Sequence, residues 1–388
     1  MSAEAGIVIV GGGPTAQAAA GAYREAGGRL SLTILAAEHE APYQRPPLTK
    51  EFLRGELVRA ELALQPLDWY RERDIELALD ERVEALDLEV GEARTEDGRR
   101  WPFRRCLLAT GARPLVPEIP GVAGPDVRLV RAVGDSEQLK ALTGQRVLVV
   151  GSGFVGCEAA ASLAMVGARV TVATLEAGPQ VDRLGSAVSE RIAGWLEGQG
   201  VEIEAGVALA EIVADPSGAL ARFEDGREQL ADAVVLALGV TRNDELAAAA
   251  GVAVDDGVLV DAAMVSSNPC LLAAGDVACA ENVGAGRRLR VEHWGEALNM
   301  GEVAGRTLAG ADASWGVVPG FWSTIGGRTL KYAGWGDGWD EVRFETGVEG
   351  SFAAWYGREG ELVGVAAHDD DAAYEEGRQL IEARAPWS

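Results

Sequence analysis

The sequence is poor in cysteine, histidine and positive charge. Its 388 residues include 4 Cys and 3 His, and the formal net charge at pH 7 is −25. Because the cysteines form no CxxC pair, a zinc site, an iron–sulfur site and a dithiol redox couple are disfavoured, and we predict no metal site. The negative charge disfavours nucleic acid and an anionic membrane as partners.

Long apolar runs are also missing. The longest, such as Ala233–Leu238, have the length of a strand and are too short to cross a bilayer. The first residues, Met1–Glu4, carry no basic segment before a long apolar run, so no signal peptide is expected. Together with reduced cysteines, these features predict a cytoplasmic protein. The sequence leaves the oligomeric state open between a monomer and a homodimer.

Glycine, by contrast, is abundant, and two glycine-rich segments occupy equivalent positions. The first fingerprint, Gly11–Ala16, follows the apolar run Ile7–Val10, and the second fingerprint, Gly151–Gly156, follows Val147–Val150. A strand that ends in such a loop brings backbone N–H groups, and the positive end of the next helix, up to a pyrophosphate. Two copies in matching context predict two bound dinucleotides, and the economical reason to bind two is to pass electrons between them.

The order of the expected elements indicates three units. The chain is too long for one ordinary core. Residues 147–176 repeat the pattern of residues 7–38, so the second unit is an inserted copy of the first, and the strand 271–274 returns the chain to the first unit. We therefore predict an α/β fold with two Rossmann-like dinucleotide-binding domains and a small α+β C-terminal domain. The predicted boundaries are 1–113 with 242–315 for the first domain, 114–241 for the second and 316–388 for the third.

Five motifs, in this order along the chain, carry a resemblance to a known family. They are Pro42–Lys50, Ala109–Gly111, Gly153–Glu158, Gly275–Ala278 and Glu292–Trp294. Together they resemble the NADH-dependent ferredoxin and rubredoxin reductases, which are FAD enzymes of the pyridine nucleotide–disulfide reductase superfamily and relatives of apoptosis-inducing factor. The resemblance implies FAD in the first domain, NADH (with NADPH as the alternative) in the second, and a ferredoxin- or rubredoxin-type electron carrier as the acceptor.

The resemblance also implies which residues hold FAD. Glu38 would accept hydrogen bonds from the ribose, and Arg45 would place a fixed cation near phosphate or ribose. Asp276 would hold the ribitol, Trp294 would lie against the pyrimidine side of the flavin, and Trp322 would lie on the face away from the nicotinamide. A loop acid, a turn aspartate and a core aromatic stay open as the alternatives for Glu38, Asp276 and Trp322, and a structural histidine stays open for His293. The other predicted FAD residues are Gly11, Gly13, Pro14, Thr15, Ala16, Lys50, Val83, Ala109, Thr110, Gly111, Glu292, His293 and Ala297.

The residues expected to act in catalysis are Lys50 and Glu158. The resemblance implies that Lys50 lies at the N5 edge of the flavin and pairs with Glu158. Since Glu158 belongs to the helix after the second fingerprint, this pair would join the two dinucleotide sites. Burial would make the loss of either partner costly. The alternative is that the two are unrelated surface charges.

The donor preference of the second domain rests on the end of its second strand. Thr174 stands where the family's ribose-binding carboxylate is expected, and the nearest acid is Glu176. Because no arginine follows Thr174 directly, a clamp for a 2′-phosphate is not visible, and NADH is favoured over NADPH. The predicted residues of this site are Gly151, Gly153, Phe154, Val155, Gly156, Glu158, Thr174, Glu176, Arg183 and Gly239.

The identity of the acceptor is less constrained, because the chain departs from the family in two places. The stretch Tyr43–Leu57 contains no cysteine, so thiol chemistry beside the flavin is disfavoured. After Phe321-Trp322-Ser323 the family's acid, amide and aromatic are replaced by Thr324–Thr329, on the acceptor side. Two alternatives therefore stay open: a redox-responsive flavoprotein of the apoptosis-inducing-factor type with slow turnover, and a reductase of quinones, oxygen or small acceptors.

A basic cluster is a candidate docking patch for the carrier. Ferredoxins are usually acidic, and this chain is acidic too, so repulsion has to be overcome locally. Three arginines just before the Glu292–Trp294 motif would provide that local charge. They are Arg287, Arg288 and Arg290. A solvated basic loop is the alternative.

Overall fold

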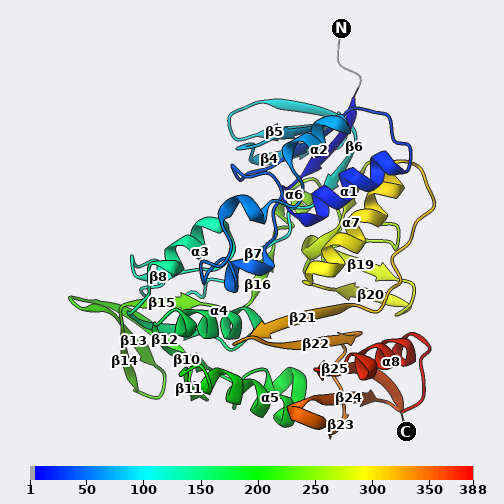
Figure 1. The fold of residues 1–388 in the computed structure, drawn as a ribbon. Coiled ribbons are helices and arrows are strands. Elements are labelled where there is room, and N and C mark those ends of the chain that lie inside the picture. Colours follow the sequence, from blue (N-terminus) through cyan, green and yellow to red (C-terminus); the bar gives the residue numbers. More distant parts are fainter. Residues whose placement is uncertain (1–4, 388) are drawn as a thin grey trace.

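The computed structural model describes residues 5–387, so Met1–Glu4, where we expected no signal peptide, lie outside the described residues. Two mainly parallel sheets and one antiparallel sheet organise the chain into three units. Figure 1 shows the first unit in the upper part, the second at the lower left and the third at the lower right. The predicted α/β class is confirmed. Within residues 5–387 no helix combines the length and the apolar composition that crossing a bilayer requires.

The first sheet contains six strands from residues 6–108 and one strand, β18, from much later in the chain. Its order is β3-β2-β1-β6-β5-β4, with β18 also paired to β6, and β1, β2, β3, β6 and β18 are parallel. The strands are β1 (Gly6–Val10), β2 (Leu32–Leu35), β3 (Ile75–Ala78), β4 (Val83–Asp87), β5 (Glu92–Thr95), β6 (Arg100–Leu108) and β18 (Leu271–Ala273). The strand after residue 270 therefore completes a sheet that begins at residue 6.

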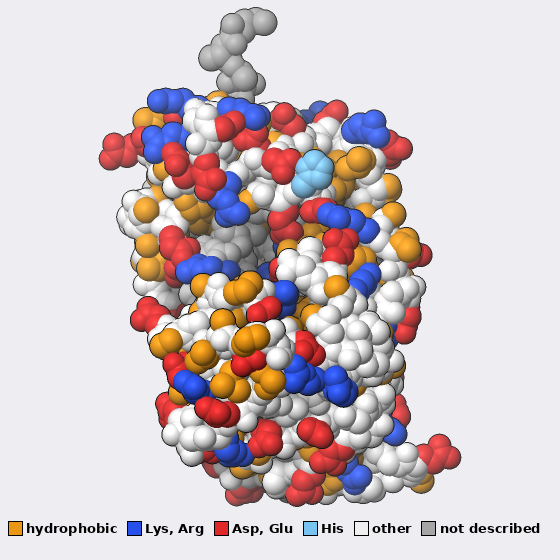
Figure 2. All heavy atoms as spheres, turned by 90° about the vertical axis from the view of Figure 1, so that its left-hand side faces the viewer, with side chains coloured by type: hydrophobic (Ala, Val, Ile, Leu, Met, Phe, Trp, Pro, Cys, Tyr) orange, Lys and Arg blue, Asp and Glu red, His pale blue; other side chains and the backbone are white. Residues whose placement is uncertain are grey.

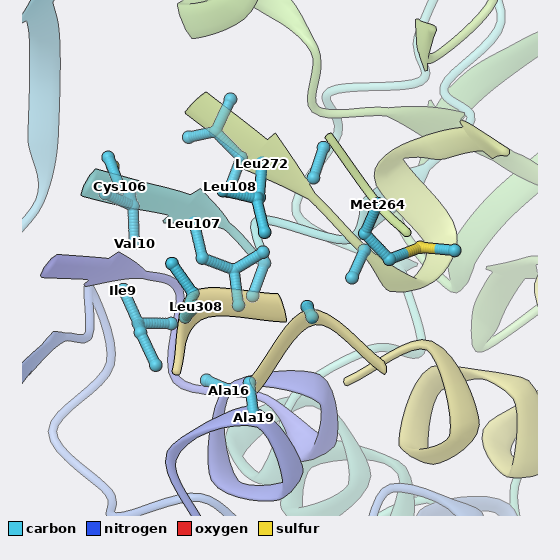
Figure 3. Packing of buried hydrophobic residues seen from close by; sticks show 14 of the residues in the cluster. Ile9, Val10, Ala16, Ala19, Cys106, Leu107, Leu108, Met264, Leu272 and Leu308 are labelled. Atoms are coloured by element: carbon cyan, nitrogen blue, oxygen red, sulfur yellow. The ribbon is translucent and has the colours of Figure 1, made fainter. Parts of the chain in front are cut away.

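Two helices cover one face of this sheet, α1 (Pro14–Glu25) and α7 (Trp294–Leu308). A Cβ on Gly301 would lie 2.6 Å from the carbonyl oxygen of Thr15, and one on Gly305 would overlap that of Ala19. Glycine at both positions therefore lets the helices touch. Ile9 and Leu107 lie opposite each other on neighbouring strands, on the sheet above α1 in the view of Figure 3, and both are fully buried.

The second unit repeats this arrangement. Its parallel sheet has the order β11-β10-β9-β15-β8, and an antiparallel sheet β12-β13-β14 adjoins it. Its elements are β8 (Val127–Arg128), α3 (Val133–Lys140), β9 (Arg146–Val150), α4 (Phe154–Met165), β10 (Arg169–Thr174), α5 (Val181–Glu197), β11 (Glu202–Ala205), β12 (Leu209–Asp215), β13 (Gly218–Phe223), β14 (Glu228–Ala231) and β15 (Ala233–Leu236).

The chain leaves the first unit and returns to it through paired strands. β7 (Ala112–Pro114) runs antiparallel to β16 (Val240–Arg242), with Arg113 opposite Thr241. The predicted boundaries at 113/114 and 241/242 fall on this pair, and they stay predictions. The first unit also contains α2 (Leu67–Glu72), which precedes the second unit. After the chain returns, it forms α6 (Glu245–Ala249), β17 (Val258–Val260), β19 (Ala278–Asn282) and β20 (Arg287–Arg290).

The third unit is an antiparallel sheet with one helix. The strand order is β21-β22-β25-β24-β23, and α8 (Asp371–Glu382) packs on the sheet, its first turn capped by the Asp370 carboxylate on the Ala373 N–H. Gly326 and Gly327 form the β21–β22 turn, both with positive φ, which suits a two-residue hairpin. The strands are β21 (Gly320–Ile325), β22 (Arg328–Gly334), β23 (Glu341–Thr346), β24 (Phe352–Arg358) and β25 (Glu361–His368).

Candidate functional site

The two fingerprint loops have the same backbone conformation at their first glycine. Gly11 has φ 123° and Gly151 has φ 105°, a region that L side chains rarely adopt. A Cβ on Gly11 would overlap the carbonyl oxygen of Ala109, just after β6, and a Cβ on Gly151 would overlap that of Ala237, just after β15. Each loop therefore turns tightly against the neighbouring parallel strand, and only glycine fits the turn.

The helices after these loops begin without a side-chain cap. Gly13 precedes α1 and Gly153 precedes α4, so the first N–H groups of each helix have no capping side chain. A Cβ on Gly13 would meet nothing within 4 Å, and on Gly153 the nearest atom would be 3.8 Å away. Both helix starts therefore face open space with unpaired donors, the arrangement that binds a phosphate.

Glu38 lies at the end of a charged cluster beside the first fingerprint. Arg45 Nη2 lies 2.6 Å from Glu38 Oε1, and the Tyr43 hydroxyl donates to Oε2 at 2.6 Å. Burial alone would raise the pKa of Glu38, but the charge of Arg45 and the hydrogen bond from Tyr43 outweigh it, and the net pKa is lowered. The carboxylate is therefore held ionised, as an acceptor for hydroxyl groups.

A residue that the sequence did not single out, Arg131, links this cluster to Asp276. Its carbonyl accepts from Arg45 Nη1 at 2.7 Å, and its guanidinium lies 3.2 Å from Asp276 Oδ2. A Cβ on Gly111 would lie 3.3 Å from the same guanidinium. The only local signal is Asp135, which caps the main chain at Arg131 and is too common a feature to identify a site.

Other predicted FAD residues lie within the same unit. The Thr110 hydroxyl donates to the Asn243 carbonyl at 2.8 Å, and Asn243 Nδ2 donates to the Thr110 carbonyl, so these groups are used inside the protein. Val83 and Ala297 are buried, whereas Trp322 on β21 is 47% exposed. Their roles toward a flavin stay predictions.

Lys50 and Glu158 form a buried ion pair where the three units meet. Lys50 Nζ lies 2.7 Å from Glu158 Oε2, and each residue is 6% exposed. The Thr49 hydroxyl donates to the same oxygen at 2.5 Å. From the C-terminal unit, the Ser323 hydroxyl and the Thr324 N–H donate to Oε1 at 2.8 and 3.3 Å. Two groups of the first unit and two of the third therefore hold a carboxylate of the second, and the sequence had not identified Thr49 or Ser323.

An aromatic contact joins the two sites. The ring of Phe321 lies 4.7 Å from that of Phe154 at the start of α4, and 4.6 Å from that of His293 at the start of α7. Nδ1 of His293 is buried without a partner among residues 5–387. Figure 2 shows one face of the molecule hollowed below the first unit. A buried polar atom without a partner, close to two helix starts, is available to form a hydrogen bond with a polar group of a bound ligand.

The environment of His293 predicts that stability depends on pH. Burial lowers its pKa from 6.5 to about 4, and the charge of Arg183 adds to this effect. The unfolded chain therefore binds a proton that the folded chain does not, and stability is full above pH 6.5 and lost as the pH falls toward 4. His293→Gln should remove up to about 2 kcal/mol of this dependence. Melting curves of both proteins between pH 7 and 4.5 test it, and parallel pH profiles would contradict it.

At the second site, the structure separates the two candidate ribose ligands. The Thr174 hydroxyl is buried and hydrogen-bonded to the Ser152 hydroxyl at 2.8 Å. Glu176 is half-buried, and its Oε2 accepts from the Asp182 N–H at 3.1 Å. The other oxygen of Glu176 forms no hydrogen bond within the described part of the chain. Glu176 is therefore the better placed of the two.

Two further predicted residues of this site lie at its surface. Gly239 has φ 100° and an open Cβ direction, and Val155 is 45% exposed.

The three arginines of the expected docking patch are not free. Arg287 pairs with Asp337, Arg288 lies 2.8 Å from Glu281, and Arg290 lies 2.7 Å from Asp255. Each positive charge is neutralised by an acid beside it, and two of these acids are distant in sequence. These ion pairs lower the net positive charge of the expected patch, and its role in docking stays a prediction.

Comparisons with known proteins cover almost the whole chain. The family model described as pyridine nucleotide-disulphide oxidoreductase matches residues 5–301, and the model described as reductase C-terminal matches residues 320–388. The anthranilate 1,2-dioxygenase system ferredoxin–NAD(+) reductase component of Burkholderia cepacia is 34% identical over 99% of this chain and 96% of its own. Rubredoxin-NAD(+) reductase of Pseudomonas putida is 31% identical over 84% and 86%. The crystal structure of the covalent putidaredoxin reductase–putidaredoxin complex matches with a TM-score of 0.93 and 26% identity, over 99% of this chain and 94% of that one.

Proposed function

Because the chain belongs to the pyridine nucleotide-disulphide oxidoreductase family, we propose that it is an FAD-dependent NADH oxidoreductase that passes electrons to a ferredoxin- or rubredoxin-type carrier. The observation that carries this proposal is the buried Lys50–Glu158 ion pair at the junction of the three units. Relatives named ferredoxin and rubredoxin reductases align over most of their own length, which supports it. FAD, when bound, would supply the conversion of a two-electron donor into one-electron steps.

The first unit fits FAD. Its helix α1 offers uncapped N–H groups for the pyrophosphate, and Glu38 is held ionised for the ribose hydroxyls. Asp276 and the unpartnered Nδ1 of His293 supply further polar groups for the rest of the FAD molecule. We propose Arg131 as an additional residue of this site, because it ties Arg45 to Asp276.

The ion pair supplies a fixed positive charge. All polar contacts of the Glu158 carboxylate are made inside the protein, so it does not reorient, and it keeps the Lys50 ammonium in one place. A preorganised cation in a water-poor site stabilises negative charge that develops beside it more than water would. We propose that this is the contribution of Lys50 to the reaction.

An anaerobic titration tests the proposal. The purified protein should be yellow, should be bleached by about one equivalent of NADH per FAD, and should then reduce a one-electron iron–sulfur carrier. Colourless protein that cannot be reconstituted with FAD would overturn the proposal. Bleaching followed by slow turnover with every carrier tested would favour the apoptosis-inducing-factor type, and rapid turnover with quinones or oxygen alone would favour the small-acceptor alternative.

The donor preference follows from Glu176. Glu176→Gln should raise the dissociation constant of NADH about tenfold and change that of NADPH less, because a charged acceptor for the ribose hydroxyls is lost. Saturation curves for flavin reduction measure both constants. Glu190→Gln, an exposed acid on α5, is the matched control and should change neither. If Thr174→Ala instead has the larger effect, the assignment to Glu176 is wrong.

We propose a cytoplasmic location as part of this function. All four cysteines are free, and three of them are buried. Burial raises the pKa of the Cys106 and Cys157 thiols, so both stay protonated and unreactive. Cysteines of this kind suit a reducing compartment, where a ferredoxin or rubredoxin would also be found.

A further inference from the structure

A short segment of the second unit, residues 180–185, is tied at its start to the second fingerprint. It begins at Gln180, which has a left-handed backbone with φ 60°, and it ends at Gly185, whose φ of 80° interrupts α5. The Gln180 side chain is buried and donates from Nε2 to the Ser152 carbonyl at 3.1 Å. The segment therefore cannot shift without disturbing the loop that carries Gly151 and Gly153.

Two aromatic side chains of the C-terminal unit hold the other end of this segment. Trp339 Nε1 donates to the Arg183 carbonyl at 2.9 Å, and the Tyr356 hydroxyl donates to the Leu184 carbonyl at 2.9 Å. A helix break leaves carbonyl groups for other donors to satisfy. A Cβ on Gly185 would lie 3.3 Å from the Trp339 ring, so the absence of a side chain there lets the ring approach.

The segment carries an unpaired cation toward the site. The Arg183 side chain is exposed and forms no ion pair among residues 5–387. Its positive charge acts to lower the pKa values of His293, Glu292 and Tyr332. The guanidinium therefore lies close enough to the start of α7 to act electrostatically on its residues. In the same segment, the Asp182 N–H supports the Glu176 carboxylate.

We propose that Trp339 is a positioning residue for the nicotinamide dinucleotide. By holding the Arg183 carbonyl, it fixes residues 180–185 so that the Arg183 guanidinium faces the dinucleotide phosphates. An arginine and a phosphate are natural partners, because the planar guanidinium donates two parallel hydrogen bonds. This inference rests on the proposed function, since it requires NADH at the second fingerprint. Through Trp339, the C-terminal unit would contribute to NADH binding without itself contacting NADH.

The test separates binding from reduction. Trp339→Phe keeps an aromatic ring beside Gly185 and removes the donor. Rapid mixing with NADH yields the dissociation constant and the limiting rate of flavin reduction separately, and calorimetric titration with ADP-ribose yields affinity without any redox step. We expect the dissociation constants of both ligands to rise about tenfold, with an unchanged limiting rate and unchanged FAD content. Arg183→Gln should have a similar effect, and the double variant should add nothing further, because one residue acts through the other.

Trp355→Phe is the matched control. Its Nε1 donates to Glu345 at 3.3 Å within the C-terminal unit, so the affinities should not change. Tyr356→Phe removes the neighbouring hydrogen bond and should raise the same constants, which keeps the test available if Trp339→Phe does not fold. Additive effects in the double variant, or unchanged affinities in Trp339→Phe, overturn the inference. Wild-type protein that NADH fails to reduce overturns the proposed function instead.

Discussion

Replacing Glu158 with alanine should lower the free energy of unfolding by about 3–5 kcal/mol, the cost of leaving a buried charge without its partner. Lys50, Thr49 and Ser323 would all lose their acceptor in a place from which water is largely excluded. The limiting rate of flavin reduction should fall at least about tenfold, because the position of the ammonium is no longer fixed. Denaturation and rapid-mixing reduction of the FAD-loaded protein measure the two effects.

Two comparisons separate the structural part of this effect from the chemical part. Glu228→Ala removes an exposed partner of Arg222 and should cost less than about 1 kcal/mol. The double variant Lys50→Met/Glu158→Leu replaces both charges with apolar groups and should recover part of the stability but not the rate, because Thr49 and Ser323 still lack an acceptor. Recovery of the rate in the double variant would show that the ion pair has no part in the reaction.

Alanine at Gly11 should yield a protein that purifies without FAD, whereas alanine at Gly151 should yield a yellow protein with NADH affinity reduced at least about 100-fold. In both loops the new methyl group would overlap a strand carbonyl, so the loop must move away from its phosphate. The FAD content of the purified protein and titration with NADH distinguish the two outcomes.

The chain provides matched controls for both substitutions. Gly27 and Gly167 follow α1 and α4, also have positive φ, and have nothing within 4 Å of an added Cβ. Alanine at either position adds backbone strain of about 1–2 kcal/mol without a clash. Both controls should keep FAD and NADH binding. Equal losses in Gly27→Ala and Gly11→Ala would mean that general instability, and not the loop, explains the missing flavin.

The parts of the fold that local sequence determines were predictable. Each fingerprint needs only a buried strand, a glycine that tolerates positive φ and a helix start, and all three are contiguous in the chain. The third unit could be recognised only as α+β, because its strand order depends on the pairing of β22 with β25, in which Leu330 lies opposite His368, 38 residues further along the chain.

The contacts of the site were harder to predict because they join distant segments. Glu158 and Ser323 are 165 residues apart, and Arg131 and Asp276 are 145 apart. Nothing beside these residues in the chain indicates the partner. For the same reason, the sequence around Arg287 did not indicate that Asp337, from the C-terminal unit, would pair with it.

The antiparallel strands β7 and β16 also make the second unit exchangeable. Because Arg113 lies opposite Thr241, the two ends of residues 114–241 are neighbours, and the unit is attached to the rest of the chain like a cassette. A dinucleotide-binding unit from another protein could replace it by splicing at these two strands. Such a graft would have to bring a carboxylate to the position of Glu158, since the donors on Thr49, Lys50 and Ser323 remain in the host and need an acceptor.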